Sequence, residues 1–215
     1  LWYEDDRTIL VKHEAYPYTF PAIGNPKWIY LSSMGEAGLP LHDELARYLA
    51  AHPDIKLVFQ PGTFQMKAGV ERLKDIYART EIFICNKEEA QRILKTDSDD
   101  IKTLLAGIGA LGPKIVVITD GPLGAYAAAD GTAYFMPPYP DPKPPYERTG
   151  AGDAFSSTFV VAIALGLPLT DALRWAPINS MSVVQYVGAR EGLLTREKLE
   201  TLLASAPADY QPRIL

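Results

Sequence analysis

Residues 81–94 read EIFICNKEEAQRIL, and this stretch joins a β-strand pattern to the start of a helix. Residues 81–85 are mostly apolar, β-branched or aromatic, which favours a strand. Asn86 follows in the place of a helix N-cap, and Ala90 and Ile93 then recur at a helical spacing. The stretch therefore predicts one strand–helix unit.

The same alternation continues on both sides of this unit. Strands are expected at residues 28–32, 55–59 and 114–119, and helices over residues 41–49, 70–77 and 101–111. The last strand, KIVVIT, is almost continuously apolar, as are strands buried on both faces of a parallel sheet. The fold class expected is α/β, with a doubly wound, mostly parallel sheet flanked by helices.

Two regions depart from this alternation. Asp130-Gly131 stands between two strand-like runs, residues 124–129 and 132–136, and is a strong signal for a two-residue hairpin turn. Residues 137–145, PPYPDPKPP, could be a polyproline ligand of an SH3-type domain, but their position favours a stiff connector across the sheet edge.

Charge and composition exclude several classes of function. The net charge is −5 and the sequence pI is about 5.3, so no basic field attracts nucleic acid or an anionic membrane. The most apolar stretch, residues 155–169, is too short and too interrupted to span a bilayer. The histidines, His13, His42 and His52, are scattered without metal-site spacing and are expected at the surface or half-buried.

Cys85 is the only cysteine, so no intramolecular disulfide can form, and a cytoplasmic location is expected. We expect its thiol to be buried rather than reactive. The chain opens LWYEDD, which is not a signal peptide and is typical of a sequence that begins inside a longer protein.

Residues 149–155, TGAGDAF, carry the strongest chemical signal. A Gly-rich turn that opens a buried helix presents unpaired N–H groups and the positive end of the helix dipole to an anion. Asp153 would lie in the first turn, where a carboxylate can accept the proton of an attacking hydroxyl. The alternative is a tight turn at Gly150 and Gly152 with Asp153 as a helix cap. The P-loop motif is absent, and G-x-G-x-x-G is not completed.

Four segments together resemble the ribokinase-like (PfkB carbohydrate kinase) family. Residues 147–155, ERTGAGDAF, resemble its C-terminal signature, and residues 86–89, NKEE, resemble its N-x-x-E element. Residues 119–124, TDGPLG, resemble its T-x-G-x-x-G turn, and Asn179 precedes Gly188-Ala189 as do family residues that line the adenine pocket. The resemblance extends roughly from Trp28 to Leu194.

The resemblance implies an ATP-dependent kinase acting on a hydroxyl of a sugar, sugar phosphate or nucleoside. Asp153 would be the general base, and the N–H groups of Gly150, Ala151 and Gly152 would form an anion hole. Asn86 and Glu89 would organise Mg²⁺ through waters, although an N-cap with a first-turn carboxylate explains the same residues. The residues implied to border the nucleotide are Thr119, Gly121, Gly124, Thr149 and Asn179. A homodimer is compatible, since lid strands in this family often pair between subunits.

Some positions depart from the family pattern. Glu147-Arg148 replaces the Asp-Thr that many members have, which leaves a monovalent-cation site in doubt and suggests that Arg148 supplies positive charge near the phosphates. Pro177 predicts a break or kink within a helix over residues 170–186. Gln65 is open between contact with a substrate hydroxyl and an ordinary surface position.

The family's N-terminal sugar-recognition segment and its small lid are not found in this sequence. Residues 7–20 could be the last lid strand, so residues 1–24 are expected to be a remnant of the lid and residues 25–215 the nucleotide-binding and catalytic core. A non-catalytic nucleotide-binding fragment without the substrate lid is therefore the alternative to a kinase.

Overall fold

The computed structural model describes residues 2–3, 6–7, 12, 14, 16 and 18–215. Its described elements begin with the paired strands β1 (Trp2–Tyr3) and β2 (Asp6–Arg7). Then come β3 (Trp28–Leu31), η1 (Glu36–Gly38), α1 (Leu39–Ala51), β4 (Lys56–Phe59), α2 (Thr63–Ala68), η2 (Glu71–Leu73), α3 (Lys74–Arg79), β5 (Thr80–Asn86), α4 (Lys87–Leu94), α5 (Ile101–Gly109) and β6 (Ile115–Thr119). The rest are η3 (Gly121–Leu123), β7 (Ala125–Ala129), β8 (Thr132–Met136), α6 (Ala151–Ala164), α7 (Leu169–Val183), α8 (Arg196–Ala204) and β9 (Arg213–Ile214). Most of the predicted residues 7–20 strand lies outside the described residues.

The chain divides into two compact units, which we describe separately. The N-terminal unit comprises most of the described chain from residue 14 to Thr119, together with Tyr126–Ala133. The C-terminal unit comprises chiefly Asp120–Ala125 and Tyr134–Leu215.

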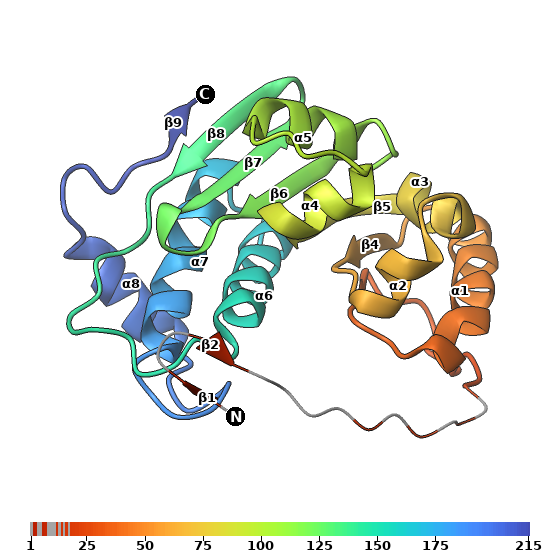
Figure 1. The fold of residues 1–215 in the computed structure, drawn as a ribbon, viewed down its shortest axis with the longest axis horizontal. Coiled ribbons are helices and arrows are strands. Elements are labelled where there is room, and N and C mark those ends of the chain that lie inside the picture. Colours follow the sequence, from red (N-terminus) through yellow and green to blue (C-terminus); the bar gives the residue numbers. More distant parts are fainter. Residues whose placement is uncertain (1, 4–5, 8–11, 13, 15, 17) are drawn as a thin grey trace. The chain divides into compact units, whose positions relative to one another are not determined.

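A seven-stranded sheet has the strand order β3-β4-β5-β6-β7-β8-β9. The pairs β3–β4, β4–β5 and β5–β6 are parallel, and β8–β9 is antiparallel. The carboxyl ends of β3, β4, β5 and β6 therefore lie at one edge of the N-terminal unit (Figure 1). Ligands of open α/β sheets bind outside this edge as a rule.

The core of the N-terminal unit lies between the sheet and helices α1, α3, α4 and α5. Alternate strand residues such as Phe59, Phe83 and Ile118 pack with helix residues such as Leu45 and Leu104 in one buried cluster. The residues that alternate with them, including Val58, Ile84 and Val117, are also at most 1% exposed. Burial on both faces explains why these strands are almost continuously apolar, as the sequence predicted.

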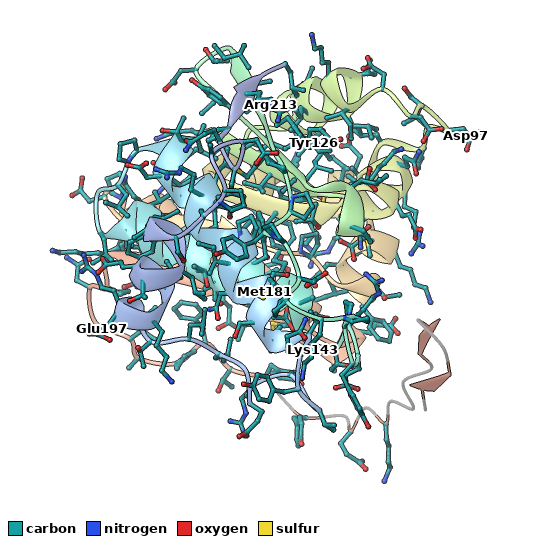
Figure 2. All side chains as sticks on the ribbon, turned by 90° about the vertical axis from the view of Figure 1, so that its left-hand side faces the viewer. Asp97, Tyr126, Lys143, Met181, Glu197 and Arg213 are labelled. Atoms are coloured by element: carbon teal, nitrogen blue, oxygen red, sulfur yellow. The ribbon has the colours of Figure 1, made fainter. Side chains whose placement is uncertain are left out.

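In the C-terminal unit, α6 and α7 pack side by side, and α8 packs against α7 (Figure 1). Figure 2 labels Met181 on α7, which is 9% exposed, and Glu197 in the first turn of α8, whose side chain is exposed. The Pro-rich segment, residues 137–149, contains neither helix nor strand. The Tyr139 hydroxyl donates a hydrogen bond to the Leu202 carbonyl at 2.9 Å, which fixes this segment to α8.

Several local predictions are confirmed, two are contradicted, and one helix was missed. The hairpin turn has Asp130 at φ 48° and Gly131 at φ 76°, as a type I′ turn requires. One continuous helix over residues 70–77 is not formed, because η2 and α3 meet at Leu73, where φ is −112° and ψ is 15°. Helix α2 was not predicted. Helix α7 continues from Leu169 through Pro177 to Val183, so the predicted break is not formed.

Candidate active site

The end of β5 carries Asn86 and Glu89 in a reciprocal capping box. The Asn86 side-chain oxygen accepts a hydrogen bond from the Glu89 N–H at 2.8 Å, and a Glu89 carboxylate oxygen accepts one from the Asn86 N–H at 2.9 Å. The cap predicted at Asn86 is confirmed. Asn86 is exposed and Glu89 is half-buried.

The end of β6 lies beside Asn86, because Asn86 and Thr119 are paired in the parallel register of β5 and β6. Thr119 leads into the turn formed by Asp120 and η3, in which the Asp120 N–H donates to the Gly124 carbonyl at 2.8 Å. Gly121 has φ 52° and Gly124 has φ 110°, and a Cβ on Gly124 would lie 2.5 Å from the Met136 carbonyl oxygen. The T-x-G-x-x-G segment is therefore a turn whose second glycine is required sterically.

The start of α6 is shaped by a glycine in the left-handed region. Gly150 is the N-cap with φ 82°, and a Cβ there would lie 2.7 Å from both Cα and Cβ of Ala189. The Gly188 N–H donates to a Glu147 carboxylate oxygen, so the turn around Gly188 is fixed to the segment that enters α6. Half-buried Thr149 lies between these two attachments in the sequence. The glycine at position 150 thus serves close backbone packing within the C-terminal unit.

The first turn of α6 exposes Gly152 and Asp153, while Ala154 and Phe155 are buried. The Ala151 N–H donates to the Arg148 carbonyl at 3.3 Å, and the Ala154 N–H donates to the Gly150 carbonyl at 2.8 Å. The N–H groups of the intervening residues point out of the helix start, as helix geometry dictates. The predicted helix is confirmed, but its burial only in part: Phe155 and Phe159 are buried, whereas Ser157 is exposed and Val161 and Leu165 are more than half exposed.

The charged residues near this helix start include Arg148 and Asp141. Partial burial raises the pKa of Asp141, and the positive charge of Arg148 opposes this shift. Arg148 is half-buried and therefore places its charge within the C-terminal unit rather than far out in solvent.

Asn179 is 7% exposed and braces the C-terminal unit from within. Its amide donates to the Thr158 hydroxyl at 2.8 Å, and its carbonyl oxygen accepts the Leu194 N–H at 3.0 Å. These two hydrogen bonds connect α6, α7 and the segment before α8. Both ends of the side chain are used in these bonds, so its observed role is to hold these elements together.

Two polar residues depart from the sequence predictions. His42 and Gln65 are each 1% exposed, so neither is a surface residue, and they contact each other. Sequence periodicity favoured an apolar face on α1 and gave no sign that a polar pair would be buried there. Cys85 is buried as expected, and burial raises the pKa of its thiol well above the usual value.

The described residues limit what can bind metal. Among them, no three His, Cys, Asp or Glu side chains gather in a way that could hold a metal ion. The oxygens of Asn86 and Glu89 do suit a hard cation such as Mg²⁺, which keeps several waters and takes further ligands from phosphates. In the described part of the chain, no helix is long and apolar enough to cross a membrane.

Comparison with known proteins points to one family. Residues 5–196 match the model of the pfkB family of carbohydrate kinases. The chain is 31% identical over 163 residues to the ribokinase of Bacillus subtilis (strain 168), which covers 75% of this chain and 50% of that protein. It is 35% identical over 117 residues to the cytidine kinase of Thermococcus kodakarensis, covering 54% and 41% respectively. The chain thus spans about half the length of these curated relatives.

Solved structures agree on the fold. Arabidopsis thaliana ribokinase complexed with ribose and ATP matches with a TM-score of 0.70 at 20% identity, over 82% of this chain and 55% of that one. Burkholderia thailandensis nucleoside kinase in complex with inosine matches with a TM-score of 0.71 at 18% identity, over 89% and 60%. The expected α/β fold, with a mostly parallel sheet flanked by helices, is confirmed, and the chain belongs to the pfkB family of carbohydrate kinases.

Proposed function

We propose that this chain is the nucleotide-binding and catalytic part of an ATP-dependent kinase whose acceptor is a hydroxyl of a sugar, sugar phosphate or nucleoside. Family membership and relatives named ribokinase and cytidine kinase support the proposal. Because the chain spans about half of those relatives, the complete activity is inferred from them rather than from this chain alone.

The observation that carries the proposal is the start of α6. Gly150 turns the chain into a largely buried 14-residue helix, and Gly152 and Asp153 remain exposed in its first turn. Outward-pointing N–H groups and the helix dipole favour an anion there. A small residue at position 152 lets a phosphoryl oxygen approach the backbone, and a carboxylate stands next to it.

In the proposed reaction, Asp153 accepts the proton of the acceptor hydroxyl. The acceptor oxygen forms a bond to the γ-phosphorus of ATP, the bond from that phosphorus to the β–γ bridging oxygen breaks, and ADP leaves. The backbone N–H groups from Gly150 to Gly152 stabilise charge on the transferred group. Since the Ala151 N–H already makes a 3.3 Å bond to the Arg148 carbonyl, that bond would have to yield or be shared.

Asn86 and Glu89 are proposed to hold Mg²⁺ through water molecules. The capping bonds through Asn86 Oδ1 and Glu89 Oε2 hold both side chains at the end of β5, where these waters would bind. When bound, the cation would neutralise charge on the ATP phosphates. Thr119, Gly121, Gly124 and Thr149 are proposed to border the nucleotide, and Asn179 to contribute by holding the segment around Leu194.

Calorimetric titration with Mg-ATP, followed by an assay of ADP release with D-ribose, D-fructose, cytidine and inosine as acceptors, tests this function. Asp153→Asn should keep nucleotide affinity and lower turnover by about 10²-fold or more. Asp171→Asn is the matched control, because Asp171 is the first-turn carboxylate of the neighbouring helix α7. Equal turnover by wild type and Asp153→Asn would overturn the assignment of the base.

The second candidate function is a nucleotide-binding fragment without catalysis. It is favoured by the chain's coverage of about half of its curated relatives. Under this alternative, Mg-ATP binds to the wild type but no acceptor yields product. Failure of a folded chain to bind Mg-ATP would count against both candidates.

A further inference from the structure

A buried polar pair lies at the carboxyl-end edge of the sheet, outside the residues assigned to phosphoryl transfer. Gln65 on α2 and His42 on α1 are each 1% exposed, and their Nε2 atoms are 3.1 Å apart. Buried polar side chains are costly unless they are fully hydrogen-bonded. The pair therefore needs a structural explanation.

The hydrogen bonds of Gln65 fix the orientation of its amide. Its oxygen accepts the Gly62 N–H at 2.7 Å and the Met34 N–H at 3.4 Å, and both partners can only donate. Its nitrogen donates to the Ser32 carbonyl at 2.8 Å, which can only accept. Turning the amide over would set donor against donor and acceptor against acceptor. The second N–H of Gln65 is thus directed at His42.

The same reasoning fixes the tautomer of His42. Its Nδ1 lies 2.9 Å from the Gly38 carbonyl oxygen, so Nδ1 carries the proton. In the neutral ring, Nε2 then has the lone pair that accepts from Gln65. A proton on Nε2 would place two donors face to face in a buried site. The network is complete only when His42 is neutral.

The segments joined by these hydrogen bonds follow two neighbouring strands of the sheet. Ser32 and Met34 follow β3, and Gly62 follows β4 and caps α2. A Cβ on Gly62 would lie 1.9 Å from the Ser33 hydroxyl oxygen, so the two segments already touch. Both lie at the edge of the sheet where α/β proteins bind ligands.

We infer that Gln65 and His42 are positioning residues that hold the segments after β3 and β4 together at the ligand-binding edge, and that they do so only while His42 is neutral. We call the hydrogen bonds that join Gln65 and His42 to the two segments the lock. That this edge serves a substrate rests on the proposed kinase function, whereas the lock itself does not rest on it.

The charges around His42 agree with a neutral ring. Burial lowers the pKa of His42; hydrogen bonding to Gly38 and the charge of Asp43 oppose that shift, and the charge of Arg72 adds to it. Arg72 donates two hydrogen bonds to Asp43, of 2.5 and 2.6 Å, so their charges largely offset each other. The other charged residues of the elements around His42 are Glu36, Glu44, Arg47, Lys67, Glu71, Lys74, Asp75 and Arg79.

The sign of the pH effect follows from the direction of the shift. Because the pKa in the folded chain lies below the ordinary 6.5, the lock is complete above about pH 6.5. It is lost as the pH falls from 6.5 through the folded pKa, where the unfolded or open chain binds the extra proton.

Amide hydrogen exchange measured by NMR against pH tests the lock in the unaltered chain. The protection factors of the Met34 and Gly62 amides, which correct for the slower intrinsic exchange in acid, should fall on the order of tenfold once His42 is protonated. The ¹⁵N shifts of the His42 ring should report the Nδ1–H tautomer at neutral pH. Titration of His42 at or above pH 6.5, or exchange at Met34 and Gly62 that does not follow it, would overturn the inference.

Two variants sharpen this test. Gln65→Glu removes both N–H donors and sets a carboxylate against His42, so the pKa of His42 should move from below to above its ordinary value. His42→Phe should abolish the acid-dependent exchange step. His52→Phe is the control, because His52 Nδ1 also lies near a carbonyl one turn earlier, that of Tyr48 at 2.8 Å, but the ring is only half-buried.

Activity distinguishes this inference from the kinase proposal. If the chain phosphorylates D-ribose, the KM for D-ribose should rise and kcat should change little when the pH falls through the His42 titration. If no acceptor gives product but exchange follows His42, the lock stands and the kinase proposal fails. If product forms but the exchange of Met34 and Gly62 does not follow the titration of His42, the kinase proposal stands and the lock is refuted.

Discussion

Gly150→Ala is the substitution that best separates the two explanations of the G-A-G-D segment. Gly150 has φ 82°, and a Cβ there would lie 2.7–2.8 Å from backbone atoms and Cβ of Ala189. A non-glycine residue in the left-handed region costs about 1–3 kcal/mol. Forced overpacking against a backbone that cannot rotate away costs about 1–3 kcal/mol more. We therefore expect a loss of roughly 2–6 kcal/mol in the free energy of unfolding.

Gly152→Ala is the matched control, two positions further along. Gly152 lies inside α6, and an added Cβ would meet nothing within 4 Å. Replacing glycine by alanine within a helix stabilises by up to about 1 kcal/mol. Its stability should therefore be unchanged or slightly raised. If the space beside Gly152 receives the phosphates, however, Mg-ATP affinity should fall by about tenfold, because the methyl group occupies that space.

Thermal unfolding followed by circular dichroism, with calorimetric titration of Mg-ATP, measures both quantities. At about 2–4 °C per kcal/mol for a chain of this size, Gly150→Ala should lower Tm by roughly 4–24 °C. A Gly150→Ala variant as stable as the wild type would refute the argument from close packing. A Gly152→Ala variant that binds Mg-ATP as tightly as the wild type would refute the anion site.

Three further predictions follow from hydrogen bonding and burial. Glu147→Ala should cost about 1–3 kcal/mol of stability by removing the acceptor of the Gly188 N–H, whereas Glu147→Gln should restore most of it; equal Tm values for both variants would contradict this. Asn86→Ala should lower the free energy of unfolding by about 1 kcal/mol, because the helix loses its N-cap. Asn86→Ser should keep the cap, so a weaker Mg-ATP affinity in that variant would show a role of the Asn86 amide in cation binding. Cys85 should resist a thiol reagent such as dithionitrobenzoate in the folded chain and react on denaturation; rapid reaction of the native chain would show that the site opens.

Local sequence signals predicted most of the elements correctly. Strands β4 to β6 were visible because burial on both faces leaves an apolar run, and β3 because its residues are mostly aromatic or β-branched. The caps and the Asp130-Gly131 turn were visible because their chemistry lies within a few residues. The break at Leu73 and the unbroken α7 through Pro177 were not visible. In both cases packing against residues distant in the sequence decides the backbone.

The polar core shows the same limit more sharply. Gly38 and Gly62 lie within one helical turn of His42 and Gln65, but the other partners of Gln65, Ser32 and Met34, lie more than 30 residues away, and no sequence spacing predicts those bonds. Asn179 was singled out for the nucleotide, yet both ends of its amide are bonded inside the C-terminal unit. Sequence patterns identify which side chains are chemically capable, whereas the hydrogen-bond partners decide how many lone pairs or N–H groups remain for a ligand.

Asn86 and Glu89 raise a related question, because helix capping and cation binding both explain these two residues in the sequence. The capping box engages one oxygen of each side chain. The cap also holds both side chains at the carboxyl end of β5, next to Thr119 in the β5–β6 register. Capping therefore orders both side chains, and under the proposed function these ordered side chains would hold the hydrated cation.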